Sequence, residues 1–301
     1  MGKKRYFKVA GLTFGIELQG DIDFELELSA YEPFVCEEPG NLLFMLPVIV
    51  DEGSRAKYDN DWDLVINTEF EGIITEIYRD KEDFYHYISY FLSRDEMWSC
   101  IDYNQDLSQM KLRVFGHANF LLYSLNNALM IMFALCCSAY DSLLFHASVI
   151  MHDERGYLFL GKSGTGKSTH SRLWLEHIEG CELLNDDNPV VRIIDGKPWV
   201  FGTPWSGKTP CYKNKRVPVG GFVKLFQASV NEITRLNTFQ AYAAILPTVS
   251  NMRWENNCAN AVSSTIEKII QQVPVFSLRN RPEKEAALMS FNSVKYSKDG
   301  K

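Results

Sequence analysis

The sequence predicts an α/β protein that carries a β-rich N-terminal module. Three features lead to this prediction. Short segments in which apolar and polar residues alternate recur up to residue 112, strands and helices alternate over residues 113–292, and a glycine-rich segment joins an apolar strand to a helix. We therefore expect a β-rich module at residues 1–112, an α/β domain at residues 113–292 and a polar tail at residues 293–301.

The composition is that of a folded, acidic protein. The chain of 301 residues has 31 basic and 38 acidic side chains, a formal net charge of −7, and 46% hydrophobic residues. Binding to nucleic-acid phosphates normally needs an excess of positive charge. We therefore expect no nucleic-acid partner.

Cysteine usage and the first residues indicate a cytoplasmic location. The seven cysteines are odd in number and have no C-x-x-C spacing, so they predict neither a complete disulfide framework nor a zinc site. The segment MGKKRYFKVAG has no apolar run of the kind found in secretion signals. Unpaired thiols and the missing signal fit a reducing compartment.

The β-rich module contains no motif that indicates a reaction, and its role stays open. Turn-forming clusters such as EEPGN separate its expected strands. These strands cover residues 6–9, 13–18, 24–28, 42–50, 73–78 and 111–115.

A long apolar helix is expected over residues 119–140. The segment has no formal charge and is long enough to span a bilayer. It also contains Asn119, Asn126 and Asn127, and such side chains are costly in lipid. We therefore interpret it as a buried helix and expect no membrane partner.

Residues 161–168, GKSGTGKS, match the phosphate-binding motif G-x-x-x-x-G-K-[ST] at every fixed position. Glycines allow successive backbone N–H groups to turn toward a polyphosphate. Lys167 would reach the β- and γ-phosphates, and Ser168 would supply an oxygen ligand for Mg²⁺. The loop follows an apolar strand and opens a helix expected at residues 168–179, whose N-terminus favours an anion.

Two consecutive aspartates follow the next expected strand, residues 182–185. A strand, loop, helix and strand in this order form a right-handed crossover, so the two strands should be parallel and end at the same edge of a sheet. Asp186 and Asp187 would then lie beside the glycine-rich loop. One carboxylate there could hold Mg²⁺, and the other could accept a proton from an attacking hydroxyl.

Two expected hairpins lead to the same edge. If Met151 pairs with Tyr157 across the turn HDERG, His146 lies opposite Lys162 and could exchange a proton at the loop. A second hairpin, with its turn at Asp195-Gly196, returns the segment GTPWSGK to the aspartates. The candidate substrate-binding residues of that segment, with an exposed tryptophan among them, are Thr203, Trp205, Ser206 and Lys208.

The segments LFHASVIM, GKSGTGKST, LLNDDNPV and GTPWSG, in this order, resemble the kinase domain of HPr kinase/phosphorylase-related proteins, which share a P-loop fold with phosphoenolpyruvate carboxykinase. The resemblance implies ATP and Mg²⁺ as cofactors, with His146 as the family's histidine and the two aspartates as its acidic pair. We expect Asp186 as base and Asp187, with Ser168, on the Mg²⁺ side, although the order of the two aspartates stays open. The implied ATP-binding residues are Gly161, Lys162, Ser163, Gly164, Thr165, Gly166, Lys167, Ser168 and Thr169.

The segment GTPWSGKTP differs from the glycine-rich segment that HPr kinase/phosphorylases use near their protein substrate. The chain therefore looks like a divergent, GTPWSG-containing subgroup that does not act on HPr. The family's ring-forming members imply a possible homo-oligomer by analogy.

Together these features predict a kinase that moves the γ-phosphoryl group of ATP to a Ser-like hydroxyl of a peptide, protein or small molecule. His146, Lys167, Asp186 and Asp187 are its expected catalytic residues. Two other hypotheses stay open. The domain could bind ATP as a non-catalytic sensor, or it could be a carboxykinase-like enzyme that acts on a small carboxylic acid.

Overall fold

The computed structural model describes residues 3–19, 28–50, 61–70, 72–91, 97–207, 209–250 and 256–295. Contacts divide the chain into two compact units, Met1–Lys8 with Leu12–Cys136 and Val9–Gly11 with Cys137–Lys301. Both units contain a large β-sheet and helices, so the α/β class is confirmed. The boundary expected at residue 112 falls inside a strand, and the division instead lies at the end of a long helix.

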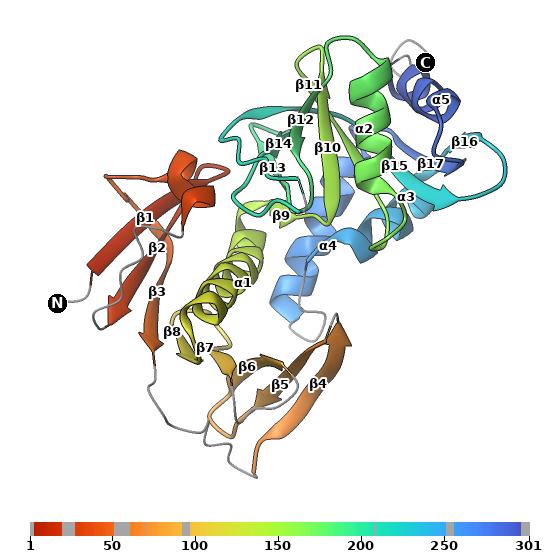
Figure 1. The fold of residues 1–301 in the computed structure, drawn as a ribbon. Coiled ribbons are helices and arrows are strands. Elements are labelled where there is room, and N and C mark those ends of the chain that lie inside the picture. Colours follow the sequence, from red (N-terminus) through yellow and green to blue (C-terminus); the bar gives the residue numbers. More distant parts are fainter. Residues whose placement is uncertain are drawn as a thin grey trace. The chain divides into compact units, whose positions relative to one another are not determined.

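The first unit is built on an eight-stranded sheet in the order β1-β2-β3-β8-β7-β6-β5-β4 (Figure 1). Strand β3 is parallel to both of its neighbours, β2 and β8, and the strands from β8 to β4 are antiparallel. The elements are β1 (Lys3–Val9), β2 (Leu12–Gln19), the 3-10 helix η1 (Ser29–Phe34), β3 (Leu42–Val50), β4 (Asp63–Phe70), β5 (Ile73–Arg79), β6 (Phe84–Phe91), β7 (Trp98–Asn104), β8 (Met110–Phe115) and α1 (Ala118–Cys137).

Most expected strands of this unit are present, and three others were missed. The strand expected at residues 24–28 falls almost wholly outside the described residues. The missed strands are β4, β6 and β7. In β6 and β7 the alternation is hidden, because β6 carries aromatic residues on both faces and β7 buries polar Ser99 and Asp102.

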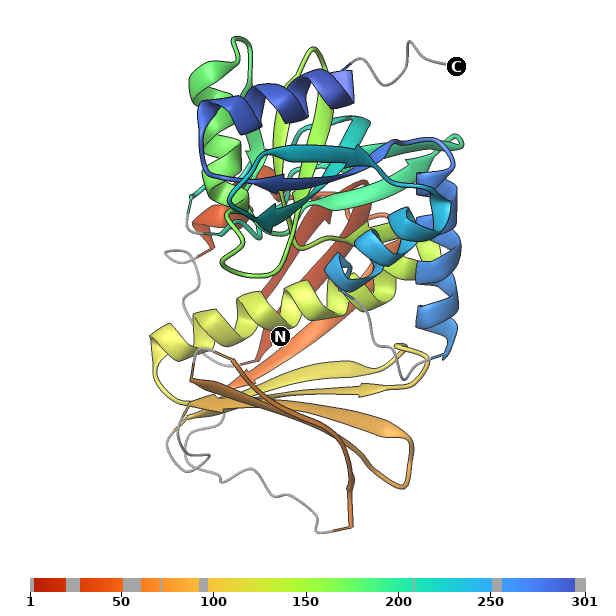
Figure 2. The ribbon, with the colours of Figure 1, turned by 90° about the vertical axis from the view of Figure 1, so that its right-hand side faces the viewer.

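Helix α1 confirms the long apolar helix expected from the sequence. Of the described helices, only the segment Asn119–Tyr140 is long and apolar enough to cross a membrane, and 67% of its most apolar window is buried inside the protein. Figure 2 shows α1 running across strands of the first unit. Phe133 of α1 meets Phe14 of β2 edge-on at 5.7 Å, and Phe120 meets Phe91 of β6 at 5.9 Å. Packing on the sheet therefore accounts for the apolar side chains of this helix.

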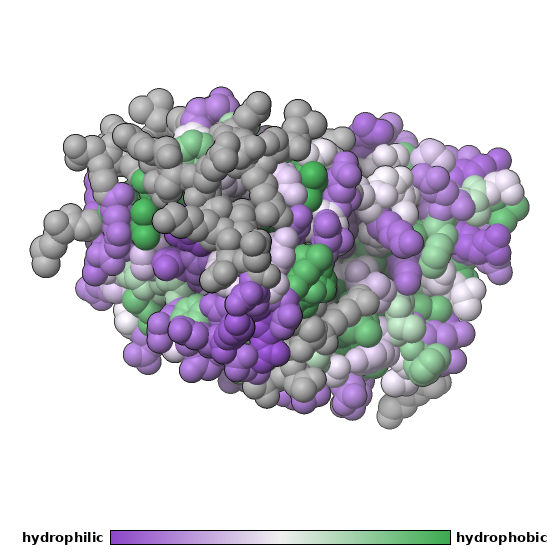
Figure 3. All heavy atoms as spheres, turned by 90° about the horizontal axis from the view of Figure 1, so that it is seen from below, coloured by the Kyte–Doolittle hydropathy of each residue, from purple (hydrophilic) through white to green (hydrophobic). Residues whose placement is uncertain are grey.

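Large apolar side chains are scattered over the described surface. They come from separate elements, such as Leu64 on β4 and Phe226 on β15. On the face drawn in Figure 3, apolar residues lie dispersed among polar ones. Single exposed apolar residues of this kind are ordinary in folded proteins.

The second unit has a sheet in the order β12-β10-β11-β15-β14-β13-β9, with β17 beside β15 and β16 beside β17. Strand β15 is parallel to both β11 and β17. Its strands are β9 (Ser142–Leu144), β10 (Ala147–His152), β11 (Arg155–Leu160), β12 (Glu182–Asn185), β13 (Val190–Ile194), β14 (Lys197–Phe201), β15 (Arg216–Gln227), β16 (Glu232–Arg235) and β17 (Val275–Asn280). Its helices are η2 (Ser138–Tyr140), α2 (Lys167–His177), α3 (Thr238–Ile245), η3 (Leu246–Thr248), α4 (Asn256–Ile270) and α5 (Lys284–Lys295).

One face of this sheet packs against α2 and α5. The core between them contains Tyr157, Phe159, Trp174, Val223, Leu225, Phe276, Leu278, Ala287 and Val294. Because α5 continues to Lys295, residues 293–295 of the expected polar tail belong to a helix. Residues 296–301, the rest of that expected tail, lie outside the described part.

The hairpin β10–β11 differs by one residue from the register expected from the sequence. Met151 pairs with Gly156 and Ala147 pairs with Leu160. Asp153 and Glu154 both adopt left-handed φ angles, 46° and 55°, and so form a two-residue turn in place of the five-residue turn HDERG. The pair Ala147–Leu160 ends the ladder. His146 immediately precedes Ala147 and Gly161 immediately follows Leu160, so His146 lies beside the start of the glycine-rich loop.

Strands β11 and β12 run in the same direction, as expected, but they are not neighbours. Each pairs antiparallel with β10, which lies between them. The second expected hairpin, β13–β14, is present with its turn at Asp195 and Gly196. The ends of β11 and β12 therefore reach the same edge of the sheet.

His170 of α2 is buried in the core of the second unit. Its ring meets Phe159 edge-on at 4.8 Å, and its Nε2 lies 2.9 Å from Ser290 Oγ on α5. Trp174 Nε1 donates to the same oxygen at 2.9 Å. Burial lowers the pKa of His170 to about 4.

Acidification is expected to destabilise the second unit through His170. The folded-state pKa lies below the value of about 6.5 for an exposed histidine. The unfolded chain therefore binds the extra proton between these values, and the free energy of unfolding should fall as the pH drops from about 6.5 to about 4. Thermal unfolding of the wild-type protein and of His170→Gln over this range measures the effect. Identical pH dependence in the two proteins would contradict it.

Candidate functional site

The glycine-rich loop, Gly161–Ser168, joins the end of β11 to the start of α2. Gly164 and Gly166 have φ angles of 79° and 99°, which side chains strongly disfavour. A Cβ at Gly161 would lie 2.3 Å from Thr165 Oγ1, and that hydroxyl donates to Lys162 O at 2.7 Å. The loop thus curls tightly in front of a helix N-terminus, the kind of position at which proteins bind anions.

Lys167 is the first residue of α2 and is only 8% exposed. Its Nζ donates to Gly161 O at 3.0 Å and to His146 Nε2 at 2.8 Å. Burial lowers the pKa of Lys167, while the charges of Asp187 and Asp186 act in the opposite direction. The ammonium group is therefore held at the mouth of the loop and near two carboxylates.

His146 links Lys167 to Asp187. An ammonium group has only donors, so Nε2 of His146 must accept and its proton lies on Nδ1. Nδ1 is 2.9 Å from Asp187 Oδ1, to which it donates. The Asp187 side chain is 31% exposed. Lys167, His146 and Asp187, taken from three separate segments, thus form one continuous chain of polar contacts.

Asp186 is buried behind this chain, at 4% exposure. Its Oδ1 accepts a hydrogen bond from Ser148 Oγ at 3.0 Å, and Ser148 Oγ lies 2.6 Å from Ser171 Oγ of α2. Its Oδ2 has no hydrogen-bond partner among the described residues. A buried carboxylate oxygen without a donor is a candidate ligand for a cation. Ser168 is exposed at the first turn of α2, so its hydroxyl is also a candidate ligand.

Sequence reasoning missed the residues that hold the aspartates in place. Asn185 is fully buried, accepts from the backbone N of Asp187 at 2.9 Å and donates to Thr203 Oγ1 at 3.0 Å. Asn188 Nδ2 donates to Asp187 Oδ2 at 2.8 Å. Both asparagines lie within the segment LLNDDN, and Ser148 is two residues from His146. Closeness in sequence to predicted site residues could therefore have indicated these three residues.

The segment expected to bind substrate packs against the acidic pair. Thr203 Oγ1 donates to Asn188 O at 2.7 Å, and a Cβ at Gly207 would lie 3.1 Å from Asp187 Cβ. Trp205 is only 2% exposed, so the expectation of an exposed tryptophan was wrong. Its backbone N–H donates to Thr203 Oγ1 at 3.2 Å, and its carbonyl oxygen accepts from Asn188 N at 3.1 Å.

The structure describes only one of the other two candidate substrate-binding residues, Ser206 and Lys208. Ser206 is half-buried, and its hydroxyl donates to Thr209 O at 2.7 Å. Lys208 lies outside the described residues. The structure therefore brings Lys167, His146, Asp186 and Asp187 together, with Thr203 and Gly207 as supports beside them.

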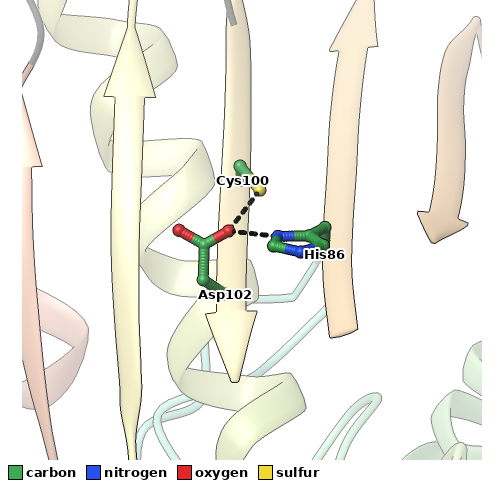
Figure 4. A group of neighbouring side chains, drawn as sticks. All are labelled: His86, Cys100 and Asp102. Carbon is green, nitrogen blue, oxygen red and sulfur yellow. Dashed lines mark hydrogen bonds and ion pairs between the residues drawn. The ribbon is translucent and has the colours of Figure 1, made fainter. Parts of the chain in front are cut away.

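A second polar cluster lies in the sheet of the first unit (Figure 4). Among the described residues, His86, Cys100 and Asp102 have ligand atoms within 4.8 Å of one another, as a metal site requires. Asp102 Oδ1 lies 2.7 Å from His86 Nδ1 and accepts from Cys100 Sγ at 3.2 Å. Arg113 binds both oxygens of Asp102, Nε to Oδ2 at 2.7 Å and Nη2 to Oδ1 at 3.0 Å.

The charges of this second cluster favour an ion-pair network over a metal site. Burial raises the pKa of the Cys100 thiol well above its ordinary value, with the charge of Asp102 adding to the effect. A protonated thiol is a poor metal ligand, and the Arg113 guanidinium already provides the positive charge. The pKa of Asp102 is lowered, because hydrogen bonds from His86 and Arg113 outweigh its burial. The cluster therefore forms a buried ion-pair network that links β6, β7 and β8.

Comparisons with known proteins assign no family to this chain. No protein-family model and no curated protein matches the chain. Among solved structures, the HPr(Ser) kinase/phosphatase from Coxiella burnetii is similar over 52% of this chain and 90% of its own, with 13% sequence identity and a TM-score of 0.33. It is a distant structural neighbour, and membership of that family stays a prediction from the motifs.

Proposed function

We propose that the second unit is a phosphotransferase that uses ATP and Mg²⁺ and transfers the γ-phosphoryl group to a Ser-like hydroxyl of a peptide, protein or small molecule. One observation carries the proposal: the Lys167–His146–Asp187 chain lies at the mouth of a glycine-rich loop that opens a helix. Phosphoryl transfer depends mainly on positioning and on neutralising charge, and this arrangement offers both.

The loop and Lys167 would hold the nucleotide. Backbone N–H groups of the loop and the N-terminus of α2 favour a polyphosphate. Lys167 would exchange its contacts with His146 and Gly161 O for phosphate oxygens. Asp186 Oδ2 and Ser168 would hold the Mg²⁺ that shields the charge of the phosphates.

Asp187 is the better candidate for the base, which reverses the order first expected for the two aspartates. Its side chain is partly exposed and held by His146 and Asn188, whereas the Asp186 carboxylate is buried against Ser148. Asp187 would take the hydroxyl proton as the acceptor oxygen bonds to the γ-phosphorus and ADP leaves. His146 would orient that carboxylate through its Nδ1–H, and Asp187, whose side chain is partly exposed, would release the proton to solvent.

Incubation with γ-labelled ATP, Mg²⁺ and a panel of amino acids, peptides and cell lysate tests the proposal. Transfer of the label to a hydroxyl-bearing acceptor is the expected result. ATP that binds but is never consumed would instead support a sensor, and label on a carboxylic acid would support a carboxykinase-like enzyme.

Replacement of Lys167 with alanine is expected to lower ATP turnover by about 10²–10³-fold, because the transition-state charge loses its buried cation. Steady-state ADP release measures the effect. Lys268→Ala on α4, which removes an exposed lysine paired with Asp141, is the matched control and should keep wild-type turnover. Equal turnover in both variants would contradict the role of Lys167.

A further inference from the structure

The two flanks of the glycine-rich loop differ in chemistry. Strands β10 and β12 lie on one side of β11 and lead to His146, Asp186 and Asp187, whereas β15 lies on the other side. The end of β15 contacts the loop, because Gln227 Nε2 donates to Gly164 O at 3.1 Å. If the γ-phosphate of the phosphoryl donor lies at Lys167 and Asp187, the rest of that donor molecule could lie along this second flank.

An exposed aromatic side chain stands at the end of β15 beside cations. Val223 and Leu225 face the core under α2 and α5, so Lys224 and Phe226 face the opposite side. Phe226 is 44% exposed, and Lys224 Nζ lies 5.6 Å from the centre of its ring. Lys224 is the ladder partner of Leu160, the last residue before the loop.

Positive charge at this flank is concentrated. Lys162 follows Leu160 by two residues, so the ladder brings it to the same end of the sheet as Lys224. Burial lowers the pKa of Lys224, and the charge of Lys162 acts in the same direction. Arg279, the ladder partner of Phe226 on β17, adds a third cation, and Glu232 of β16 is opposite Arg279. A flat apolar ring bordered by cations fits a ligand that combines a planar base with phosphates.

We propose that Phe226 stacks on the base of the donor nucleotide, with Lys224 and Lys162 facing its phosphates. This inference rests on the proposed function and deepens it, because it makes the donor a nucleoside triphosphate in preference to an inorganic polyphosphate. Stacking on Phe226 is tolerant of base identity, since every base has an aromatic face.

Calorimetric titration of ATP and of inorganic tripolyphosphate, each with Mg²⁺, tests the inference. Phe226→Ala should weaken ATP binding about 5- to 150-fold, the range of base–aromatic stacking, and leave tripolyphosphate binding unchanged. Phe226→Trp should retain ATP binding. Phe239→Ala on α3, where the ring is 82% exposed, is the matched control and should bind both ligands like the wild type.

Four outcomes would overturn the inference. ATP affinity unchanged in Phe226→Ala, or an equal loss for ATP and tripolyphosphate, contradicts stacking while the proposed function stands. An unchanged ATP affinity with a raised KM for the acceptor would assign this flank to the acceptor instead. Binding of neither ligand by the wild-type protein would overturn the proposed function and this inference with it.

Discussion

Replacement of Asp187 with asparagine should lower the rate of phosphoryl transfer by about 10²–10⁴-fold, the usual contribution of a general base. The substitution keeps the size of the side chain and its contact with Asn188 but removes the carboxylate that His146 orients. ATP affinity should change little, because the loop and Lys167 are intact. Single-turnover transfer of label, measured beside equilibrium binding of ATP, separates the two effects.

Two further variants complete this test. Asp186→Asn should raise the Mg²⁺ concentration needed for half-maximal transfer, because the affected carboxylate oxygen is the buried one without a hydrogen-bond partner among the described residues. Asp195→Asn in the β13–β14 turn is the control, since asparagine tolerates the φ of 50° found there. Full transfer by Asp187→Asn together with its loss in Asp186→Asn would return the role of base to Asp186.

Replacement of Asp102 with alanine should destabilise the first unit by about 3–5 kcal/mol. The carboxylate is almost fully buried and binds Arg113 through both oxygens and His86 through one. Its removal leaves the partly buried Arg113 guanidinium and the His86 ring without their shared acceptor. Urea-induced unfolding measures the change in the free energy of unfolding.

The control for this variant is an exposed ion pair in the same unit. Asp61→Ala removes the partner of Lys81, and both side chains are mostly exposed, so the loss should be about 0–1 kcal/mol. The pKa of Asp102 is lowered in the folded state, so its stabilisation is present above the ordinary pKa of an aspartate and is lost as the pH falls toward the lowered value. Equal stability of Asp102→Ala and Asp61→Ala would contradict the stabilising role assigned to the contacts of Asp102.

Local signals predicted much of the second unit. The strand at residues 182–185, the β13–β14 hairpin and the helix after the glycine-rich loop depend on turn chemistry and short-range pattern. Strands β6 and β7 of the first unit could not be predicted in this way. Their polar residues are satisfied by partners on other strands, as Asp102 is by Arg113, and such partners are invisible in a local window.

The composition of the candidate site and its position beside the loop were predictable, but the burial of its individual side chains was not. The motifs identified Lys167, His146 and the two aspartates, because each residue type is typical of the expected chemistry. The roles of Asp186 and Asp187 depend on which carboxylate is buried, and that follows from Ser148 and Ser171 on other elements. The burial of Trp205 likewise follows from tertiary packing.

A crystal structure with Mg²⁺ and a non-hydrolysable ATP analogue tests the central claim most directly. We predict that Lys167 Nζ leaves His146 Nε2 and lies about 2.7–3.2 Å from an oxygen of the γ-phosphate, with the Asp187 carboxylate facing that phosphate. An analogue bound away from the glycine-rich loop, with the Lys167–His146 contact of 2.8 Å intact, would contradict it.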